Sequence, residues 1–194
     1  MGKTRLEAFS DGVIAIIITI MVLEMKVPHG DQLTNLAPLL PVFISYILSF
    51  VNVGIYWNNH HHMLHAAHKV NSKVMWANMH LLFWLSLFPF VTGWMGENHF
   101  TTVPIILYGG VLLMAGIAYY ILSHALIQLH GADSTLAIAV GKDRKGIFSV
   151  MIYAFAIPLS LINGYIGLVL YAAVAAMWLI PDQRIERKVV EKHG

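Results

Sequence analysis

Long apolar stretches separated by short polar segments dominate the hydrophobic pattern of this chain. A helix that crosses a bilayer core of ~30 Å needs roughly 20 predominantly apolar residues. By this criterion the predicted spans lie at residues 5–27, 36–64, 74–95, 103–129, 147–162 and 165–180. Only Asn163 and Gly164 separate the last two, and this strong turn signal predicts a tight antiparallel hairpin. The pattern therefore predicts an all-α, polytopic membrane protein with six transmembrane helices.

Composition narrows the class of protein further. Of the 194 residues, 58% are hydrophobic and 11% are charged, whereas soluble domains carry roughly 25% charged residues. This excludes an ordinary soluble protein, and we expect residues 1–194 to form one transmembrane domain without a soluble domain. The chain has no cysteine, which excludes disulfides, thiolate catalysis and cysteine metal sites. Residues 181–194 are polar and are expected to form a cytoplasmic tail.

The basic residues are distributed asymmetrically. Eleven of the twelve lysines and arginines precede the first span, follow the last, or lie between spans two and three or four and five. With six spans, all of these segments lie on one side of the membrane, and only Lys26 lies on the other. The positive-inside rule then places both termini in the cytoplasm, in the cell membrane of a prokaryote.

The first predicted span carries ionisable groups at both ends. Arg5 and Asp11 precede its apolar run, and Glu24 and Lys26 follow it. Ionisable side chains at membrane depth are costly, so they are candidates for function. Four copies of Glu24 at an outer mouth would concentrate cations through their surface potential. The alternative is that Glu24 and Lys26 are a charged pair that extends to the membrane interface.

The start of this span resembles the first-helix signature of the endolysosomal potassium-channel family and its bacterial homologues. The signature R-x-x-x-F-S-D is formed by Arg5, Phe9, Ser10 and Asp11. The similarity continues at Tyr56-Trp57 and His60-His61 in the second span, and at Asn78 before the run LLFWLSLFPF in the third. Length, span count and orientation also agree with the family.

The resemblance implies an assembly and a set of pore residues. Bacterial members of the family form homotetramers in which the first span of each subunit lines the pore, and a ring of branched apolar side chains is its narrowest part. The position five residues after the aspartate is Ile16, which becomes the expected constriction. Thr19, Ile20 and Leu23 would form the following layers. The implied permeant ion is potassium, and no cofactor is expected.

Helical geometry is compatible with these pore residues. Ile16, Ile20 and Leu23 lie within about 60° of one another on a helix. Apolar rings cannot replace an ion's hydration shell, but they can gate by dewetting and favour the ion that sheds water more easily. Potassium over sodium is the expected preference. However, isoleucines on membrane helices usually face lipid or packed helices, and Ile14 and Ile17 are equally apolar, so only the motif selects Ile16.

The resemblance also implies a buried polar network that holds the first span. Its expected members are Arg5, Phe9, Ser10, Asp11, His61 and Asn78. Which of the three consecutive histidines at positions 60–62 is the partner of Asp11 stays open. In the alternative interpretation Ser10 is a helix N-cap and Asp11 interacts only with the helix dipole. Because histidine titrates near neutrality, such a network would make gating sensitive to pH.

The histidines also raise the possibility of a metal site. His61, His65 and His68 are expected to share a helical face, and histidines at i and i+4 can bind zinc. No H-E-x-x-H motif and no acidic ligand is nearby. We therefore expect no metal centre, and interpret the cluster as an interfacial segment.

Three functions remain, in order of preference. The first is a potassium-selective cation channel with passive conduction. The second is a proton-coupled secondary transporter that uses an Asp11–histidine network, although transporters usually show paired halves with broken spans and this chain shows none. The third is a metal-dependent membrane enzyme, which predicts stoichiometric zinc and loss of activity on chelation.

Overall fold

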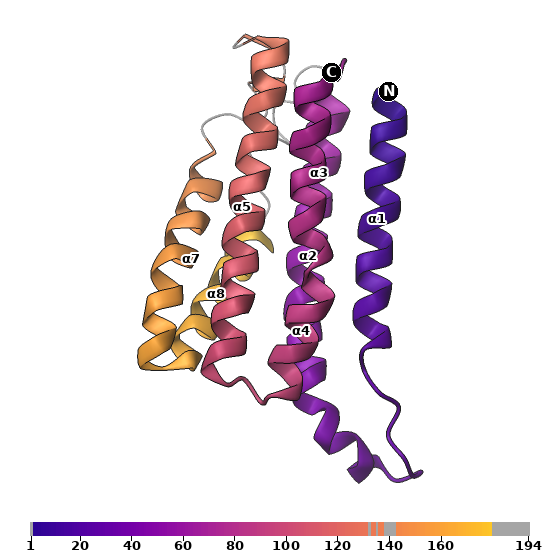
Figure 1. Ribbon diagram of the computed structural model, residues 1–194, viewed down its shortest axis with the longest axis vertical. Helices are drawn as coiled ribbons and strands as arrows, with labels where there is room; N and C mark the ends of the chain where they lie inside the picture. The colour runs from indigo at the N-terminus through magenta and orange to yellow at the C-terminus, as the bar shows by residue number, and fades with distance from the viewer. Residues whose placement is uncertain (1, 132, 135, 138–142, 180–194) are drawn as a thin grey trace, which may run out of the picture.

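The structure is a computed structural model that describes residues 2–131, 133–134, 136–137 and 143–179. All regular structure within these residues is helical, and most helices run along the long axis of one bundle (Figure 1). The expected all-α membrane fold is therefore confirmed. The predicted tail, 181–194, and the last residue of the sixth span lie outside the described residues.

The helices follow the predicted spans closely. They are α1 (Lys3–Leu23), the 3-10 helix η1 (Leu33–Leu39), α2 (Leu40–Ala66), α3 (Ser72–Ser86), α4 (Phe88–Glu97), α5 (Thr102–His130), α7 (Arg144–Ile162) and α8 (Gly164–Leu179). Five stretches are long and apolar enough to cross a membrane, with η1 continuing into α2 and α3 into α4. The sixth predicted span is α8, which has 16 described residues and measures about 24 Å.

Two of the differences from the predicted spans have identifiable reasons. The first helix ends at Leu23, four residues earlier than predicted, and Lys26 lies beyond it, where it forms an ion pair with Glu97. The third span is divided at Leu87 into α3 and α4. Pro89 explains this break, because it has no N–H and its ring would clash with the carbonyl group four residues earlier.

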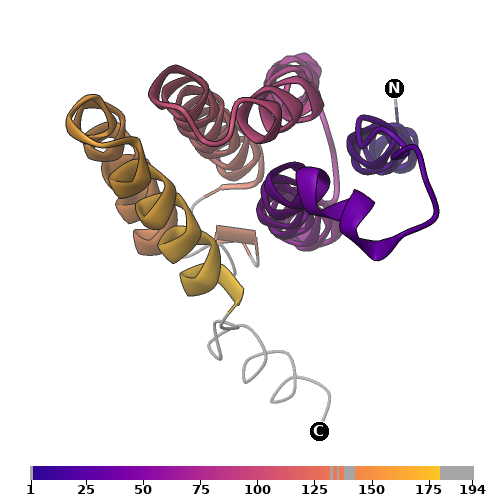
Figure 2. The same ribbon diagram turned by 90° about the horizontal axis from the view of Figure 1, so that it is seen from below.

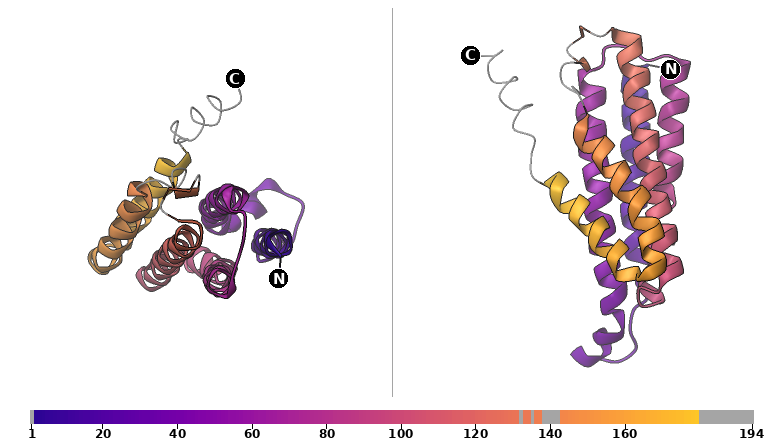
Figure 3. Two further views of the ribbon diagram at one scale, coloured as in Figure 1. Left: turned by 90° about the horizontal axis from the view of Figure 1, so that it is seen from above. Right: turned by 90° about the vertical axis from the view of Figure 1, so that its left-hand side faces the viewer.

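The bundle has two distinct edges. Helix α1 lies at one edge and packs against α2, α3 and α4 (Figure 2). The hairpin of α7 and α8 lies at the other, where only Asn163 separates the two helices. Helix α8 crosses the bundle at a steeper tilt than the other helices (Figure 3). One face of α1 is thus packed against the bundle, and the other points away from it.

A chain of hydroxyl groups joins α2, α4 and α5 in the interior. The Thr92 hydroxyl donates to Ser49 Oγ at 2.6 Å, and Ser49 Oγ donates to the Tyr108 hydroxyl at 3.1 Å. Asn52 Nδ2 lies 3.4 Å from the same tyrosine oxygen. All four side chains are buried. Interhelical hydrogen bonds of this kind contribute on average ~0.6 kcal/mol each in membrane proteins, so the chain fixes the relative positions of these three helices.

We predict that Gly96→Ala destabilises the bundle. A Cβ at Gly96 would lie 2.6 Å from the Val42 Cα and 2.6 Å from Ser45 Oγ, so α2 and α4 would have to separate. Overpacking of this kind costs about 1–3 kcal/mol. The midpoint of thermal unfolding in detergent measures the effect. The matched control is Gly110→Ala, whose Cβ would have no atom within 4 Å; equal midpoints for the two variants would contradict the prediction.

Candidate pore-lining face and buried polar network

The buried face of α1 is a regular helical stripe. Its residues recur every three or four positions and are Leu6, Ser10, Ile14, Ile17 and Met21. This spacing places them on one side of the helix. Because α1 contacts α2, α3 and α4, this stripe is the surface that anchors α1 to the rest of the chain.

The opposite face of α1 carries every residue predicted to line the pore. Ile16 is 58% exposed, whereas Ile14 is 1% and Ile17 is 3% exposed. Thr19, Ile20 and Leu23 are exposed on the same side of the helix. Within one chain, Ile16 is therefore not part of a packed core. Packing separates it from the neighbouring isoleucines, which sequence periodicity alone could not do.

Thr19 is the only residue with a hydroxyl group on this exposed stripe. Its Oγ1 donates to the Ile16 carbonyl oxygen at 2.9 Å and lies 3.2 Å from the Ala15 carbonyl oxygen. Because the proton is directed to the helix's own backbone, the oxygen lone pairs point outward. The side chain therefore presents an acceptor, which suits a cation.

A buried hydrogen-bonded chain connects α1, α2 and α3. Asn78 Nδ2 donates to Ser10 Oγ at 2.9 Å, and Asn78 Oδ1 lies 2.7 Å from His60 Nε2. Ser10 Oγ donates in turn to the Leu6 carbonyl oxygen at 2.8 Å. An amide oxygen only accepts, so His60 carries its proton on Nε2. Ser10, His60 and Asn78 are all fully buried, and each bond in the chain has a defined direction.

The histidine in this hydrogen-bonded chain is His60. The resemblance implied His61, which is the next residue along the helix. Successive helical residues differ by about 100°, so only one of them can face α3. His61 is exposed, and its ring stacks at 5.9 Å on Trp57 and at 6.1 Å on His65. His60, and not His61, is therefore the histidine that contacts Asn78.

Asp11 has a different partner from the one expected. Trp57 Nε1 donates to Asp11 Oδ1 at 3.0 Å, and no described hydrogen bond joins Asp11 to a histidine. The sequence pattern did not indicate Trp57 as a member of the network. A signal was present, because Tyr56-Trp57 is one of the places where the chain resembles the family. An indole N–H fixes the carboxylate without exchanging a proton at neutral pH, so this contact is a structural link between α1 and α2.

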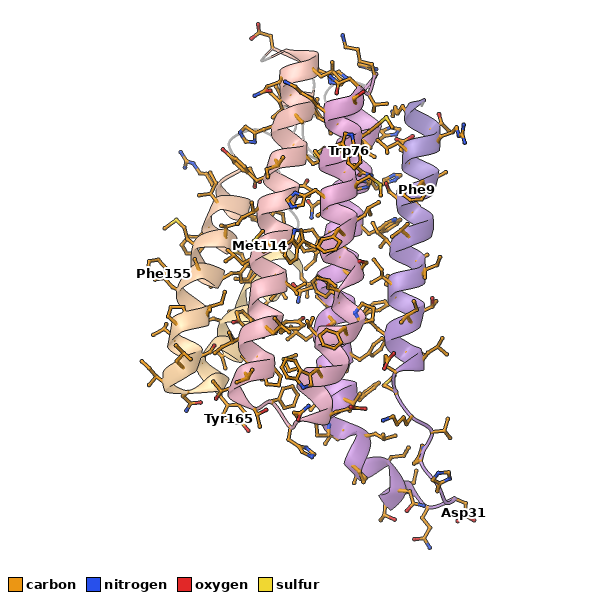
Figure 4. The ribbon with its side chains drawn as sticks, in the orientation of Figure 1. Phe9, Asp31, Trp76, Met114, Phe155 and Tyr165 are labelled. Carbon is orange, nitrogen blue, oxygen red and sulfur yellow. The ribbon has the colours of Figure 1, made fainter. Side chains whose placement is uncertain are left out.

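Arg5 and Phe9 lie outside the buried network. Both are exposed on α1, on the same side as Ile16, and Figure 4 labels Phe9 on this edge helix. The Arg5 guanidinium group has no hydrogen bond or ion pair with another described residue. Of the six residues expected in the network, the structure thus brings Ser10 and Asn78 together within one chain. It leaves Arg5 and Phe9 on the exposed face.

At the other end of α1, the charged residues are solvent-exposed. Lys26 Nζ lies 3.0 Å from Glu97 Oε1, and this hydrogen bond raises the pKa of Lys26. Glu24 is exposed, and its carboxylate has no hydrogen bond or ion pair with any residue that the structure describes. The two charges of the predicted mouth are therefore not a mutual pair, because Lys26 is bound to α4.

The predicted shared face of His61, His65 and His68 is not formed. Helix α2 ends at Ala66 and the chain continues in an extended conformation, so His68 leaves the helix. The backbone N–H groups of His68 and Lys69 instead donate to His130 Nε2 at 3.0 and 3.3 Å. Within the described residues, no three His, Asp or Glu side chains are placed to hold a metal ion.

Comparisons with known proteins relate this chain to one family of channels. The model of the family described as "Endosomal/lysosomal potassium channel TMEM175" matches residues 5–89. A potassium channel of Chryseobacterium sp. is 51% identical over 191 residues, covering 98% of this chain and 100% of that protein. The crystal structure of a lysosomal potassium-selective channel TMEM175 homolog from Chamaesiphon minutus superimposes with a TM-score of 0.79. It is 28% identical and covers 92% of this chain and 96% of that one.

More distant similarity reaches the animal proteins. The human endosomal/lysosomal proton channel TMEM175 is 37% identical over 73 residues, which are 31% of this chain and 14% of that protein. The residues that match the family model include nearly all of α1 and the whole of α2 and α3, where the exposed stripe and the buried network lie. The resemblance seen in the first span is confirmed, and the chain belongs to the family of the endosomal/lysosomal potassium channel TMEM175.

Proposed function

We propose that this protein is a potassium-permeable cation channel, selective for potassium over sodium, in the cytoplasmic membrane of a prokaryote. It acts as a homotetramer with both termini in the cytoplasm, and α1 of each subunit lines the pore. The observation that carries this proposal is the exposed stripe of Ile16, Thr19, Ile20 and Leu23. It lies on a helix at the edge of the bundle whose opposite face is fully packed (Figure 2).

A fourfold arrangement gives this stripe a function. Ile16 and Leu23 are about 10 Å apart along the helix axis, so four copies of α1 stack apolar rings along a narrow path. The ring at Ile16 is the constriction, and Thr19 supplies the outward acceptor oxygens beside it. A path without a carbonyl cage discriminates through the cost of dehydration. Potassium is favoured over sodium because it holds its water less tightly.

Reconstitution into liposomes with a potassium gradient tests the proposal. Wild-type protein should carry potassium passively and faster than sodium, without a proton gradient. Single-channel recordings should show unitary steps, which imply fluxes far above the turnover of carriers at roughly enzyme rates. Potassium movement that required a proton gradient would contradict the channel and support a coupled transporter.

The structure offers less support for the proton-coupled alternative. The relay would join Asp11 to a histidine, but the described partner of Asp11 is the indole of Trp57. His60 is bonded to an amide, which does not pass protons along a chain.

Membership in a channel family also argues against a metal-dependent enzyme. The human relative's name refers to protons, so proton flux should be measured in the same liposomes.

Glu24→Gln should reduce potassium conductance at low ionic strength only. Four exposed carboxylates at the outer mouth raise the local cation concentration through their potential. At about 0.01 M salt the Debye length is ~30 Å, and at 1 M it is ~3 Å, so the effect should vanish at high salt. The matched control is Glu24→Asp, which keeps the negative charge and should keep the conductance of the wild type at low salt. Equal conductance of wild type and Glu24→Gln at low salt would exclude a role for Glu24.

A further inference from the structure

A groove with a mainly apolar wall and several polar groups lies between α3 and α5, away from α1. It has a volume of about 680 Å³, and its lining includes Lys73, Trp76 and His80 from α3 and Tyr120, His124 and Gln128 from α5. It begins at the end of the bundle where α3 starts and α5 ends, the same end as the N-terminus (Figure 1). In the proposed orientation this is the cytoplasmic leaflet.

The polarity of the groove lining changes with depth in the membrane. The two helices run in opposite directions, so Lys73 and Gln128 lie at the membrane surface and His80 and Tyr120 lie deepest. Five residues of each helix line the groove, and they extend over about 12 Å of helix axis. Ile121 and two alanines supply its apolar surface. A charged rim above a mixed polar and apolar wall matches a lipid headgroup followed by its glycerol and first methylene groups.

Hydrogen bonds hold the deeper groups in place. His124 Nδ1 lies 3.0 Å from the Tyr120 carbonyl oxygen, and the centroids of the two tilted rings are 3.9 Å apart. Trp84 Nε1 donates to His80 Nε2 at 2.9 Å. Trp76, in contrast, is 76% exposed (labelled in Figure 4), and its indole makes no hydrogen bond with the described residues. Tryptophan at such a depth places its ring at headgroup level and offers an N–H donor.

Charge indicates which lipid fits. The lining contains one lysine and two histidines, and none of its residues is acidic. Basic pockets between membrane helices on the cytoplasmic side bind anionic headgroups, and that leaflet carries negative charge. We propose that the groove binds the headgroup of an anionic phospholipid through Lys73 and Trp76. This inference rests on the membrane orientation given under the proposed function, but not on ion conduction.

Lipid retention measured by native mass spectrometry tests the inference. Detergent-purified protein is titrated with phosphatidylglycerol or phosphatidylcholine, and bound lipid is counted by mass. Wild type should retain phosphatidylglycerol in preference. Lys73→Gln should lower that retention about fivefold, because a lysine near an anionic surface contributes ~1 kcal/mol. Trp76→Ala should lower it as well. Lys69→Gln is the matched control, because Lys69 is exposed at the same end of the bundle but outside the groove.

Three results would overturn the inference. One is equal retention of the two lipids by wild type. Another is an equal loss in Lys73→Gln and Lys69→Gln, which would indicate general surface charge rather than a site. The third is displacement of phosphatidylglycerol by soluble glycerol phosphate alone, which would assign the groove to a free phosphate compound. Since retention is read by mass, failure of the channel proposal in flux assays leaves this test intact.

Discussion

Replacing Ile16 with asparagine is expected to raise ion leak through the reconstituted protein and to lower its potassium-over-sodium preference. Ile16 is exposed on the α1 stripe, and four amides at the constriction would hydrate a ring that otherwise excludes water. A tenfold loss of discrimination corresponds to only ~1.4 kcal/mol, which is a small change for four side chains. Parallel potassium and sodium fluxes in liposomes measure it.

The control for this variant is Ile147→Asn on α7. Ile147 is also an exposed isoleucine on a membrane helix, but its helix, α7, lies at the edge of the bundle opposite α1 (Figure 2). Its replacement should leave both the leak and the ion preference unchanged. Unaltered fluxes in Ile16→Asn, from protein inserted in equal amount, would remove Ile16 from the conduction pathway.

Replacing His60 with alanine is expected to destabilise the protein strongly, whereas the same change at His61 should have little effect. His60 is buried and lies 2.7 Å from Asn78 Oδ1. Its loss leaves a buried acceptor unpaired, which costs about 1–3 kcal/mol, and adds a cavity. His61 is exposed, and exposed substitutions usually change stability by less than ~0.5 kcal/mol. Thermal unfolding of both variants in detergent gives the comparison.

A double-mutant cycle then tests whether the chain through Asn78 is one unit. Asn78→Ala removes partners from both His60 and Ser10, so its effect and that of His60→Ala should be less than additive. Residues in one hydrogen-bond network show such coupling, while distant ones do not. Strictly additive effects, or equal losses in His60→Ala and His61→Ala, would contradict the chain of bonds described here.

The helical architecture could be predicted from the sequence because membrane spans obey simple rules of length and hydropathy. The span at 103–129 matches α5 within one residue at each end, and Asn163 forms the turn that its turn-forming character indicates. The early end of α1 at Leu23 could not be predicted, because it accompanies an ion pair between Lys26 and a residue of α4. Such contacts depend on how the helices pack.

The candidate site was predictable only where a motif supplied what periodicity lacks. Ile14, Ile16 and Ile17 are alike in composition, and the motif alone distinguished Ile16; the structure then separates them by exposure. The partners of the polar residues were harder to predict. Which histidine faces α3 is a matter of about 100° of helix rotation. The Trp57 bond to Asp11 requires knowing that α1 and α2 are adjacent at that level.

Arg5 is a predicted member of the polar network that one chain leaves exposed. Its charge and its place in the signature predicted a buried partner, yet it lies exposed on the same side of α1 as Ile16. Four copies of α1 around an axis would bring this position near neighbouring subunits. An intersubunit partner for Arg5 is consistent with the proposed assembly, and its contacts are then set by oligomerisation rather than by the fold of one subunit.

Cysteine accessibility tests most directly whether the exposed face of α1 surrounds water. The chain has no native cysteine, so Ile16→Cys and Phe155→Cys can each be probed alone with a charged, membrane-impermeant thiol reagent. Phe155 is exposed on α7 at the far edge of the bundle (Figure 4). The account predicts that the reagent labels Ile16→Cys and changes its potassium current, while Phe155→Cys stays unlabelled. Two unlabelled cysteines in a conducting protein would show that Ile16 faces lipid, and the pore would have to lie elsewhere.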